Sequence, residues 1–519
     1  MTARLALHAW ALLFVFGVIT ILPIVSARQL PFADLPEHAA VSAALAHWND
    51  PAWKSREFFS FDPTTTPYWL YDLVGALLAR VVGSARVAHV LLLSLVGVAI
   101  PLAAAHWLRS LGRDPRLGVF ACVLFWSKAL HYGLLPFVAA IPVFFLAIAE
   151  YTYMLRSRRS RVRRAFVTAL LGLTLVLLHA TVFFAFVLTS LCSGLSYRAR
   201  RGPPLALRFA PLVSGCLLVA FYWARAKEHM TEATVGFLPL GRMLASIPEW
   251  SFGVWHRRDE KVMAMLYWGG YLGVFLTGFR RLRSGLLPWW PFIGVATIFF
   301  TFPFEIGTGL MLNIRMGPLL AVLLLPTLRL RATRSSIVAQ LLVLVGVVGQ
   351  SVVALAGIEN AQASLGDFDR IIESVPMGSR VIHLPFESGT PSPWRHIAAA
   401  IRVERGGLSQ YSFTHLAHWP LQDRVSPRKP YLFWDRRPCV FDPDSDAQHY
   451  DAILVTGPYD PFRGVEERER HAAAASFELT VSAPPFYLWQ RKGTGIAERR
   501  ASPPDVDLRD APCPKWGTP

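Results

Sequence analysis

Charged side chains are scarce in this sequence of 519 residues. They make up 17% of the chain, whereas apolar residues make up 53% and the mean hydropathy is +0.37. A typical soluble domain is about one quarter charged, so the composition excludes both a disordered chain and a wholly soluble globule. The formal net charge is +17, but the arginines stand in short clusters between apolar runs. This distribution is typical of a polytopic membrane protein and argues against a nucleic-acid partner.

Cysteines and the common catalytic motifs are also rare or missing. The chain has five cysteines and no CxxC pair, and it contains no P-loop, HExxH, complete GxGxxG or nucleophile elbow. Cys439 and Cys513 lie in the polar C-terminal part and can form a disulfide if that part is extracytoplasmic. His415 and His418 are three residues apart, but no third ligand is spaced nearby. We therefore predict no cofactor and no resident metal, since nothing in the spacing indicates a divalent cation.

Long apolar runs dominate the first 357 residues. A run of about 20 residues crosses roughly 30 Å of hydrocarbon, and we expect spans near 7–26, 68–83, 87–108, 133–155, 208–224, 262–279, 286–302, 311–328 and 336–357. The longer run at 166–194 predicts two short helices that turn at His179. The run at 117–131 is too short to cross and predicts a re-entrant or peripheral segment. Together the runs predict an all-α membrane domain of about ten to twelve helices over residues 1–357.

Arginine clusters set the expected orientation of these helices. They lie at 156–164, 198–208, 280–283 and 329–334, and the positive-inside rule places all four in the cytoplasm. The N-terminus is then cytoplasmic, and the first external loop, 27–66, and everything after residue 357 are extracytoplasmic. The first run is longer than the apolar core of a signal peptide, so we expect an uncleaved helix rather than cleavage after Ala27. One segment conflicts with the positive-inside rule. If the runs at 68–83 and 87–108 both cross the membrane, the basic residues at 109–116 lie outside.

The composition changes after the last apolar run. From about Glu359 the chain is polar and proline-rich. Residues 381–385, 452–456 and 477–481 have strand composition, and residues 365–375 have an amphipathic helical pattern. We predict a small extracytoplasmic α/β domain over 358–495 and a disordered tail at 496–519.

The first external segment carries the residues with the clearest chemistry. Asp34, Glu37 and His38 follow the first helix, and their spacing lets all three point the same way at a helix start. In one interpretation Asp34 is the N-cap and Glu37 completes a capping box. In the other, Asp34 is a general base at the membrane face, assisted by Glu37 or His38. The helix over 37–48 has an apolar face, and we expect it to rest on the membrane surface.

Further ionisable residues lie near the ends of the apolar runs. Asp72 stands one turn inside the run at 68–83, where a carboxylate is costly and is either functional or simply hydrated. Arg315 is placed to bind a phosphate, or it is a snorkelling interfacial arginine. Lys128 and His131 are external phosphate ligands or interface anchors, and His179 is a turn residue with a ligand role or a packing role.

Together these features resemble the GT-C superfamily of polytopic membrane glycosyltransferases, in an uncharacterised bacterial branch. The resemblance covers roughly residues 1–357. It rests on Asp34 in the first external loop, the Pro67-Tyr68 re-entry, the turn at Leu178-His179-Ala180, the sequence Asn313-Ile-Arg315-Met-Gly-Pro and the polar C-terminal domain. Many members have two adjacent acidic residues in the first loop, whereas this chain has Asp34-Leu-Pro-Glu37.

The resemblance implies a multi-pass enzyme of the bacterial cytoplasmic (inner) membrane. Such an enzyme transfers a sugar from a polyprenyl-phosphate donor to a glycan, lipid or protein acceptor, and Asp34 is implied as the catalytic residue, with Glu37 and His38 beside it. Arginine is the best bidentate partner of a phosphate, so we expect Arg315 to bind the donor phosphate, with contributions from Lys128, His131 and His179. Two alternatives stay open: a secondary transporter, which requires inverted repeats that are not visible, and a non-catalytic membrane scaffold in cell-envelope assembly.

Overall fold

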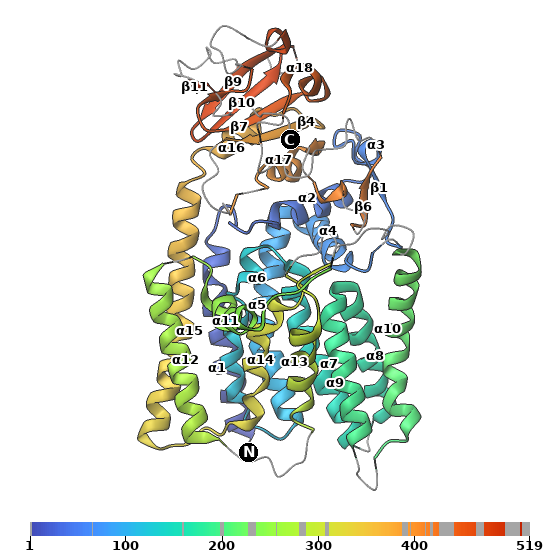
Figure 1. The fold of residues 1–519 in the computed structure, drawn as a ribbon, viewed down its shortest axis with the longest axis vertical. Coiled ribbons are helices and arrows are strands. Elements are labelled where there is room, and N and C mark those ends of the chain that lie inside the picture. Colours follow the sequence, from blue (N-terminus) through green and yellow to red (C-terminus); the bar gives the residue numbers. More distant parts are fainter. Residues whose placement is uncertain are drawn as a thin grey trace. The chain divides into compact units, whose positions relative to one another are not determined.

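The protein is described here from a computed structural model. It covers residues 3–64, 66–157, 160–197, 202–226, 235–255, 257–279, 287–306, 311–386, 393–394, 396–409, 412–415, 419–424, 438, 441–462, 472–493 and 509–510. The chain divides into two compact units. The first comprises Met1–Ala27, Thr64–Tyr71 and Val90–Gly357, and the second comprises Arg28–Pro63, Asp72–His89 and Ile358–Pro519. Figure 1 labels most of the helices and several of the strands.

The first unit is helical. Its long helices are α1 (Ala3–Val25), α5 (Ala85–Ser110), α7 (Leu135–Arg156), α8 (Arg161–Leu178), α9 (Ala180–Ser196), α10 (Leu205–Ala226), α12 (Arg258–Gly278) and α15 (Arg334–Ala363). The shorter helices are α6 (Lys128–His131), α11 (Leu240–Phe252), α13 (Trp290–Thr301) and α14 (Gly317–Leu323), with 3-10 segments η1 (Pro115–Leu124), η3 (Ile314–Met316) and η4 (Leu325–Thr327). Two short strands, β2 (Val235–Gly236) and β3 (Glu305–Ile306), pair antiparallel.

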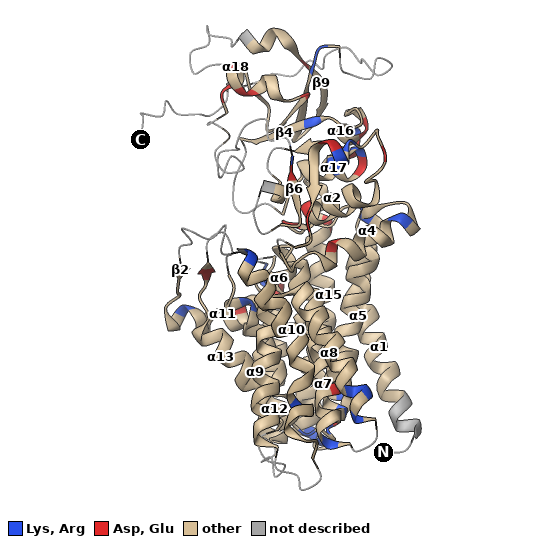
Figure 2. Ribbon diagram, turned by 90° about the vertical axis from the view of Figure 1, so that its right-hand side faces the viewer, with Lys and Arg blue, Asp and Glu red and all other residues tan. Residues whose placement is uncertain are grey.

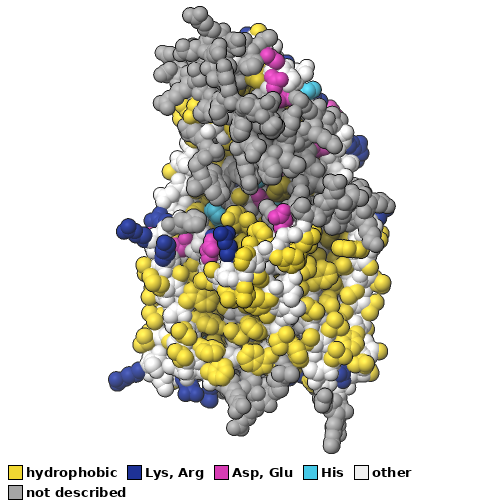
Figure 3. All heavy atoms as spheres, in the orientation of Figure 1, with side chains coloured by type: hydrophobic (Ala, Val, Ile, Leu, Met, Phe, Trp, Pro, Cys, Tyr) yellow, Lys and Arg dark blue, Asp and Glu magenta, His cyan; other side chains and the backbone are white. Residues whose placement is uncertain are grey.

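Five of the described helices are long and apolar enough to cross a membrane. They are His8–Val25 within α1, Leu205–Arg225 within α10, and the whole of α5, α7 and α15. Large apolar side chains are exposed on them, including Phe14 at 54% and Leu217 at 66%. Figure 3 shows apolar side chains, in yellow, covering much of the visible face of the helical part of the protein. An apolar surface of this extent is rare on a soluble monomer.

Three of the expected spans form shorter helices. α4 (Leu70–Val82) has 13 residues and ends at Gly83, whose φ of +79° is the left-handed conformation that commonly stops a helix. At roughly 20 Å it is too short to cross a bilayer alone. The run at 286–302 forms only the 12 residues of α13. The run at 311–328 is divided into η3, α14 and η4, because Pro318 and Pro326 each open a new turn and supply no N–H to the preceding one.

The predicted turn at His179 is confirmed. α8 ends at Leu178 and α9 begins at Ala180, while His179 has an extended backbone with φ −162° and ψ 104°. The 29-residue apolar run is therefore two helices that pack against each other and against α7 and α10.

Glycines allow α12 and α15 to pack closely. A Cβ at Gly270 would lie 2.6 Å from the Ala339 carbonyl oxygen, and one at Gly273 would lie 2.8 Å from the Ala339 Cβ. A Cβ at Gly346 of α15 would lie 2.8 Å from the Tyr267 Cβ. Side chains larger than hydrogen at these three positions would therefore force the two helices apart.

Basic residues gather at one end of the first-unit helices. Arg156 ends α7, and α8 begins with Arg161, Arg163 and Arg164; Figure 2 shows this blue group near the lower end of the helices. The end of α5 lies beside it, because Arg156 Nη1 donates to the Ser110 carbonyl oxygen. The basic segment 109–116 therefore belongs to this arginine-rich end. The count that placed residues 109–116 outside assumed that the run at 68–83 crosses the membrane. α4, which forms from this run, is too short to cross.

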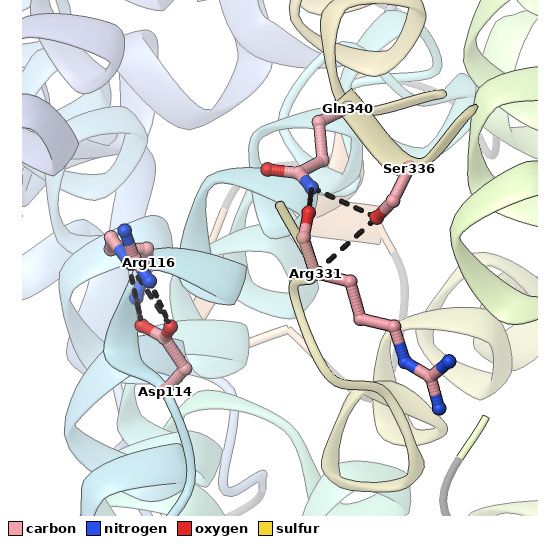
Figure 4. A network of polar contacts seen from close by, with 5 residues as sticks. All are labelled: Asp114, Arg116, Arg331, Ser336 and Gln340. Atoms are coloured by element: carbon pink, nitrogen blue, oxygen red, sulfur yellow. Dashed lines mark hydrogen bonds and ion pairs between the residues drawn. The ribbon is translucent and has the colours of Figure 1, made fainter. Parts of the chain in front are cut away.

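Two further polar contacts fix chain turns in this unit (Figure 4). Asp114 accepts a hydrogen bond from the Arg116 backbone N–H at 3.0 Å and pairs with the Arg116 guanidinium. The backbone contact caps the start of η1. Gln340 donates to the Arg331 carbonyl oxygen at 3.2 Å and to the Ser336 hydroxyl at 3.1 Å, which anchors the first turns of α15. Neither contact involves a predicted site residue.

The second unit is built on a five-stranded sheet of order β5-β4-β7-β10-β9. The strands are β4 (Arg380–Pro385), β5 (Leu408–Ser409), β7 (Ala452–Thr456), β9 (Phe477–Ala483) and β10 (Phe486–Arg491). β5, β4 and β7 run parallel, and β10 is antiparallel to both of its neighbours. One face packs on α16 (Phe368–Ser374) and α17 (Ala398–Arg405), and the other on the segments around α18 (Pro443–Asp446). The three predicted strands and the predicted helix over 365–375 are confirmed.

The first loop belongs to this same unit. It contains α2 (Leu35–Ala46), α3 (Ser55–Phe58) and β1 (Phe59–Phe61), and β1 pairs antiparallel with β6 (Leu421–Asp423). α2 packs against α17, and eleven of its twelve residues are buried. The expectation that this helix rests on a membrane surface is wrong, because its small apolar side chains pack inside the protein.

Short elements complete the second unit. They are η5 (Phe413–His415), η8 (Ala447–His449), η9 (Ala472–Ser476), β8 (Tyr459–Asp460) and β11 (Arg509–Asp510), and β11 pairs parallel with β8. Apart from β11, the predicted tail at 496–519 lies outside the described residues, as do Cys439, Cys513 and His418.

Candidate functional site

Asp34 precedes the first turn of α2 but does not cap it. Its backbone is helical, with φ −95° and ψ −4°, and its side chain makes no capping hydrogen bond. The carboxylate instead faces His396, with 3.5 Å between Asp34 Oδ1 and His396 Nε2. The Asp34 side chain is 25% exposed and that of His396 only 3%. The capping-box interpretation is therefore wrong, and Asp34 presents a partly accessible carboxylate against a buried imidazole.

Glu37 is held in a buried ion pair. Arg402 Nη1 of α17 lies 3.3 Å from Glu37 Oε2, and the two side chains are 2% and 1% exposed. The Ser412 hydroxyl donates to the same oxygen at 3.0 Å and the Phe413 backbone N–H at 3.3 Å. The carboxylate thus joins α2 to α17, which is a structural role.

His38 and Asp72 form a second buried pair. The sequence singled out the two residues separately, and the structure brings His38 Nδ1 to 2.8 Å from Asp72 Oδ1, with side chains 4% and 0% exposed. Ser42 continues the polar cluster, because its hydroxyl lies 3.0 Å from the Asp72 carbonyl oxygen and 3.0 Å from His89 Nε2. This cluster connects α2 with α4 and the start of α5.

Phe413 forms an apolar wall beside both imidazoles. Its ring centroid lies 6.3 Å from that of His38 and 5.5 Å from that of His396, in edge-to-face arrangements. Trp419 adds a ring 5.1 Å from His38. Asp34 and His38, one helical turn apart at the start of α2, are therefore each paired with a partner from another part of the second unit.

A further histidine, His383, lies in β4, close to His396. His383 Nε2 lies 2.8 Å from the Thr456 hydroxyl, at the carboxyl end of the parallel strand β7. Burial, with a smaller contribution from His396, lowers the pKa of His383 to about 3. His383 is therefore neutral near neutral pH and adds no charge beside His396.

Arg315 and His179 meet within the first unit. Arg315 Nη1 donates to His179 Nε2 at 3.0 Å, and the Arg315 guanidinium lies 5.8 Å from the centre of the Phe137 ring. The Tyr68 ring lies 5.6 Å from the His179 ring. Two of the predicted phosphate ligands are thus adjacent, at the broken helix segment η3 and at the α8–α9 turn.

Lys128 and His131 have different surroundings. Lys128 Nζ pairs with the Glu249 carboxylate of α11, whose side chain is 57% exposed. The His131 ring packs edge-to-face on Trp255 at 5.6 Å. The predicted role of Lys128 as a phosphate ligand is weakened, because a carboxylate already compensates its charge.

The predicted site residues fall into two sets. Asp34, Glu37 and His38 belong to the second unit, whereas Lys128, His131, His179 and Arg315 belong to the first. Sequence reasoning missed the partners His396 and Arg402, because each lies in polar sequence about 360 residues from its partner and no local spacing marks it. Among the described residues, no group of three or more His, Cys, Asp or Glu side chains is arranged to hold a metal ion.

In comparisons with known proteins, no family model and no curated protein matches this chain.

Proposed function

We propose that the protein is a polytopic membrane glycosyltransferase of the GT-C type, which transfers a sugar from a polyprenyl-phosphate donor to an acceptor hydroxyl outside the bacterial cytoplasmic membrane. The five apolar helices support the membrane part of this proposal. One observation carries the catalytic part: the Asp34 carboxylate makes no cap hydrogen bond, is 25% exposed and faces a buried imidazole. A carboxylate in such a position can accept a proton from a bound substrate.

The reaction uses Asp34 as the general base. The acceptor hydroxyl gives its proton to the Asp34 carboxylate while its oxygen attacks the anomeric carbon of the donor sugar. The bond between that carbon and the phosphate oxygen breaks, and the lipid phosphate leaves with the electron pair. The anomeric centre is inverted by this single displacement.

The donor phosphate requires a cation, and Arg315 is the best candidate in the first unit. Arg315 is 7% exposed, and its guanidinium bonds to His179 and lies over the Phe137 ring. Arginine binds phosphate oxygens in a bidentate manner. Lys128, which pairs with Glu249, and His131, which packs on Trp255, are weaker candidates for the same role.

The test is the variant Asp34→Asn, in the full chain reconstituted in nanodiscs. The amide keeps the size of the side chain but cannot accept the proton, so we expect turnover to fall by roughly 10²–10⁴-fold at unchanged yield of folded protein. Asp50→Asn is the matched control, because Asp50 is a loop carboxylate of the same unit whose contact with the Ala52 N–H an amide oxygen can keep.

Two measurements identify product formation. The first is the glycan and lipid profile of a deletion strain complemented with each variant, and the second is sugar transfer from labelled polyprenyl-phosphate donors to envelope acceptors. Full activity of Asp34→Asn in both measurements would exclude Asp34 as the base.

A further inference from the structure

We propose that His396 positions Asp34 for proton abstraction, so that the C-terminal part of the chain supplies one side of the acceptor-activating site. This inference rests on the proposed function of Asp34. His396 Nε2 lies 3.5 Å from Asp34 Oδ1, within ion-pair distance of the carboxylate. Contacts of catalytic groups are often this long before substrate binds.

The surroundings of His396 favour a fixed imidazole. Its side chain is 3% exposed, and its ring packs edge-to-face on Phe413 at 5.5 Å. It stands two residues before α17, and α17 is joined to α2 by the buried pair of Glu37 and Arg402. Because this pair lies one turn from Asp34, it fixes the distance between the two elements that carry Asp34 and His396.

The accessibility of the two side chains gives them different roles. Asp34 is 25% exposed and can meet an acceptor hydroxyl, whereas His396 is almost fully buried behind it. His396 therefore acts through Asp34: it orients the carboxylate and takes no proton from the acceptor. A free carboxylate would sample several rotamers, and misplacement of a reacting group by about 1 Å can cost 10²-fold in rate.

Other titratable groups described around the pair are already engaged. Glu37 is compensated by Arg402, and His38 is paired with Asp72. His383 is bonded to Thr456 and is neutral. The orientation of the Asp34 carboxylate is therefore most sensitive to the loss of His396.

The test compares four variants of the full chain in nanodiscs: His396→Leu, His396→Gln, Asp34→Asn and the control His47→Gln. We expect His396→Leu to lower kcat by about 10–100-fold with an unchanged KM for the donor. Gln can place an N–H near the position of Nε2, so His396→Gln should recover most of the rate. His47 also faces a carboxylate of this unit, Asp50 at 3.8 Å, and its replacement should leave the rate unchanged.

The split between kcat and KM, together with the rescue by glutamine, separates positioning from a merely structural role. A merely structural loss would lower the yield of folded protein, and His396→Gln would not recover the rate. Adding His396→Leu to Asp34→Asn should cause no further loss of rate. A wild-type rate in both His396 variants, together with an inactive Asp34→Asn, would refute the positioning role but leave the base intact. A fully active Asp34→Asn would instead refute the proposed function itself.

Discussion

The variant Arg402→Met should destabilise the second unit strongly. Arg402 and Glu37 are 2% and 1% exposed, with 3.3 Å between Nη1 and Oε2. Without the arginine, the hydrogen-bond partners of the buried carboxylate among the described residues are the Ser412 hydroxyl at 3.0 Å and the Phe413 N–H at 3.3 Å. Removing one partner of a buried ion pair costs about 3–5 kcal/mol. For a domain of this size, a loss of that order lowers the thermal midpoint by roughly 6–20 °C.

The assay is thermal unfolding of the full chain in nanodiscs, followed by tryptophan fluorescence. Arg86→Met is the matched control, because Arg86 pairs with Glu404 at 3.7 Å while the two side chains are 41% and 34% exposed; it should cost less than about 1 kcal/mol. Glu37→Leu combined with Arg402→Met should recover much of the loss, since no buried charge remains. Equal midpoints for Arg402→Met and Arg86→Met would refute the reasoning.

Three further predictions concern other parts of the molecule. Gly75→Ala should destabilise the protein, because the new Cβ would lie 2.6 Å from the Ser42 Oγ; a midpoint equal to wild type would show that this packing can relax. The pKa of His383 is about 3 in the folded state and 6.5 in the unfolded state, so the unfolded chain gains a proton first and stability falls as the pH decreases from about 6.5 towards 3. His383→Gln should lack this component, which unfolding midpoints at a series of pH values will measure. A reporter enzyme fused after Gly457 should be active only on the extracytoplasmic side, and cytoplasmic activity would overturn the proposed topology.

Local sequence patterns predicted the elements that depend on local physics. Strand composition located β4, β7 and β9, and the long apolar run interrupted by His179 predicted α8 and α9. The lengths of the apolar runs predicted the lengths of the helices less well. A hydropathy window does not register that Gly83 ends α4 or that Pro318 and Pro326 divide the run at 311–328.

The candidate site depends on contacts that sequence patterns cannot show. Asp34 has the spacing of a capping residue, yet its carboxylate faces His396, which lies more than 360 residues later. Glu37 was expected to assist Asp34, but Arg402 and Ser412 hold it in the core. The alanine-rich helix α2 has the pattern of a surface helix, because nothing in its own residues indicates that α17 will cover it.

The pairing of β1 with β6 has a consequence for biosynthesis. Ser60 and Gln422 are 362 residues apart, and ribosomes add about 5–20 residues per second. Roughly 20–70 s therefore pass between the synthesis of β1 and the synthesis of its partner strand β6. During this time β1 is an open strand edge that other chains can pair with. A nonsense variant that stops shortly before Leu421 would retain all five apolar helices and still leave this edge permanently open.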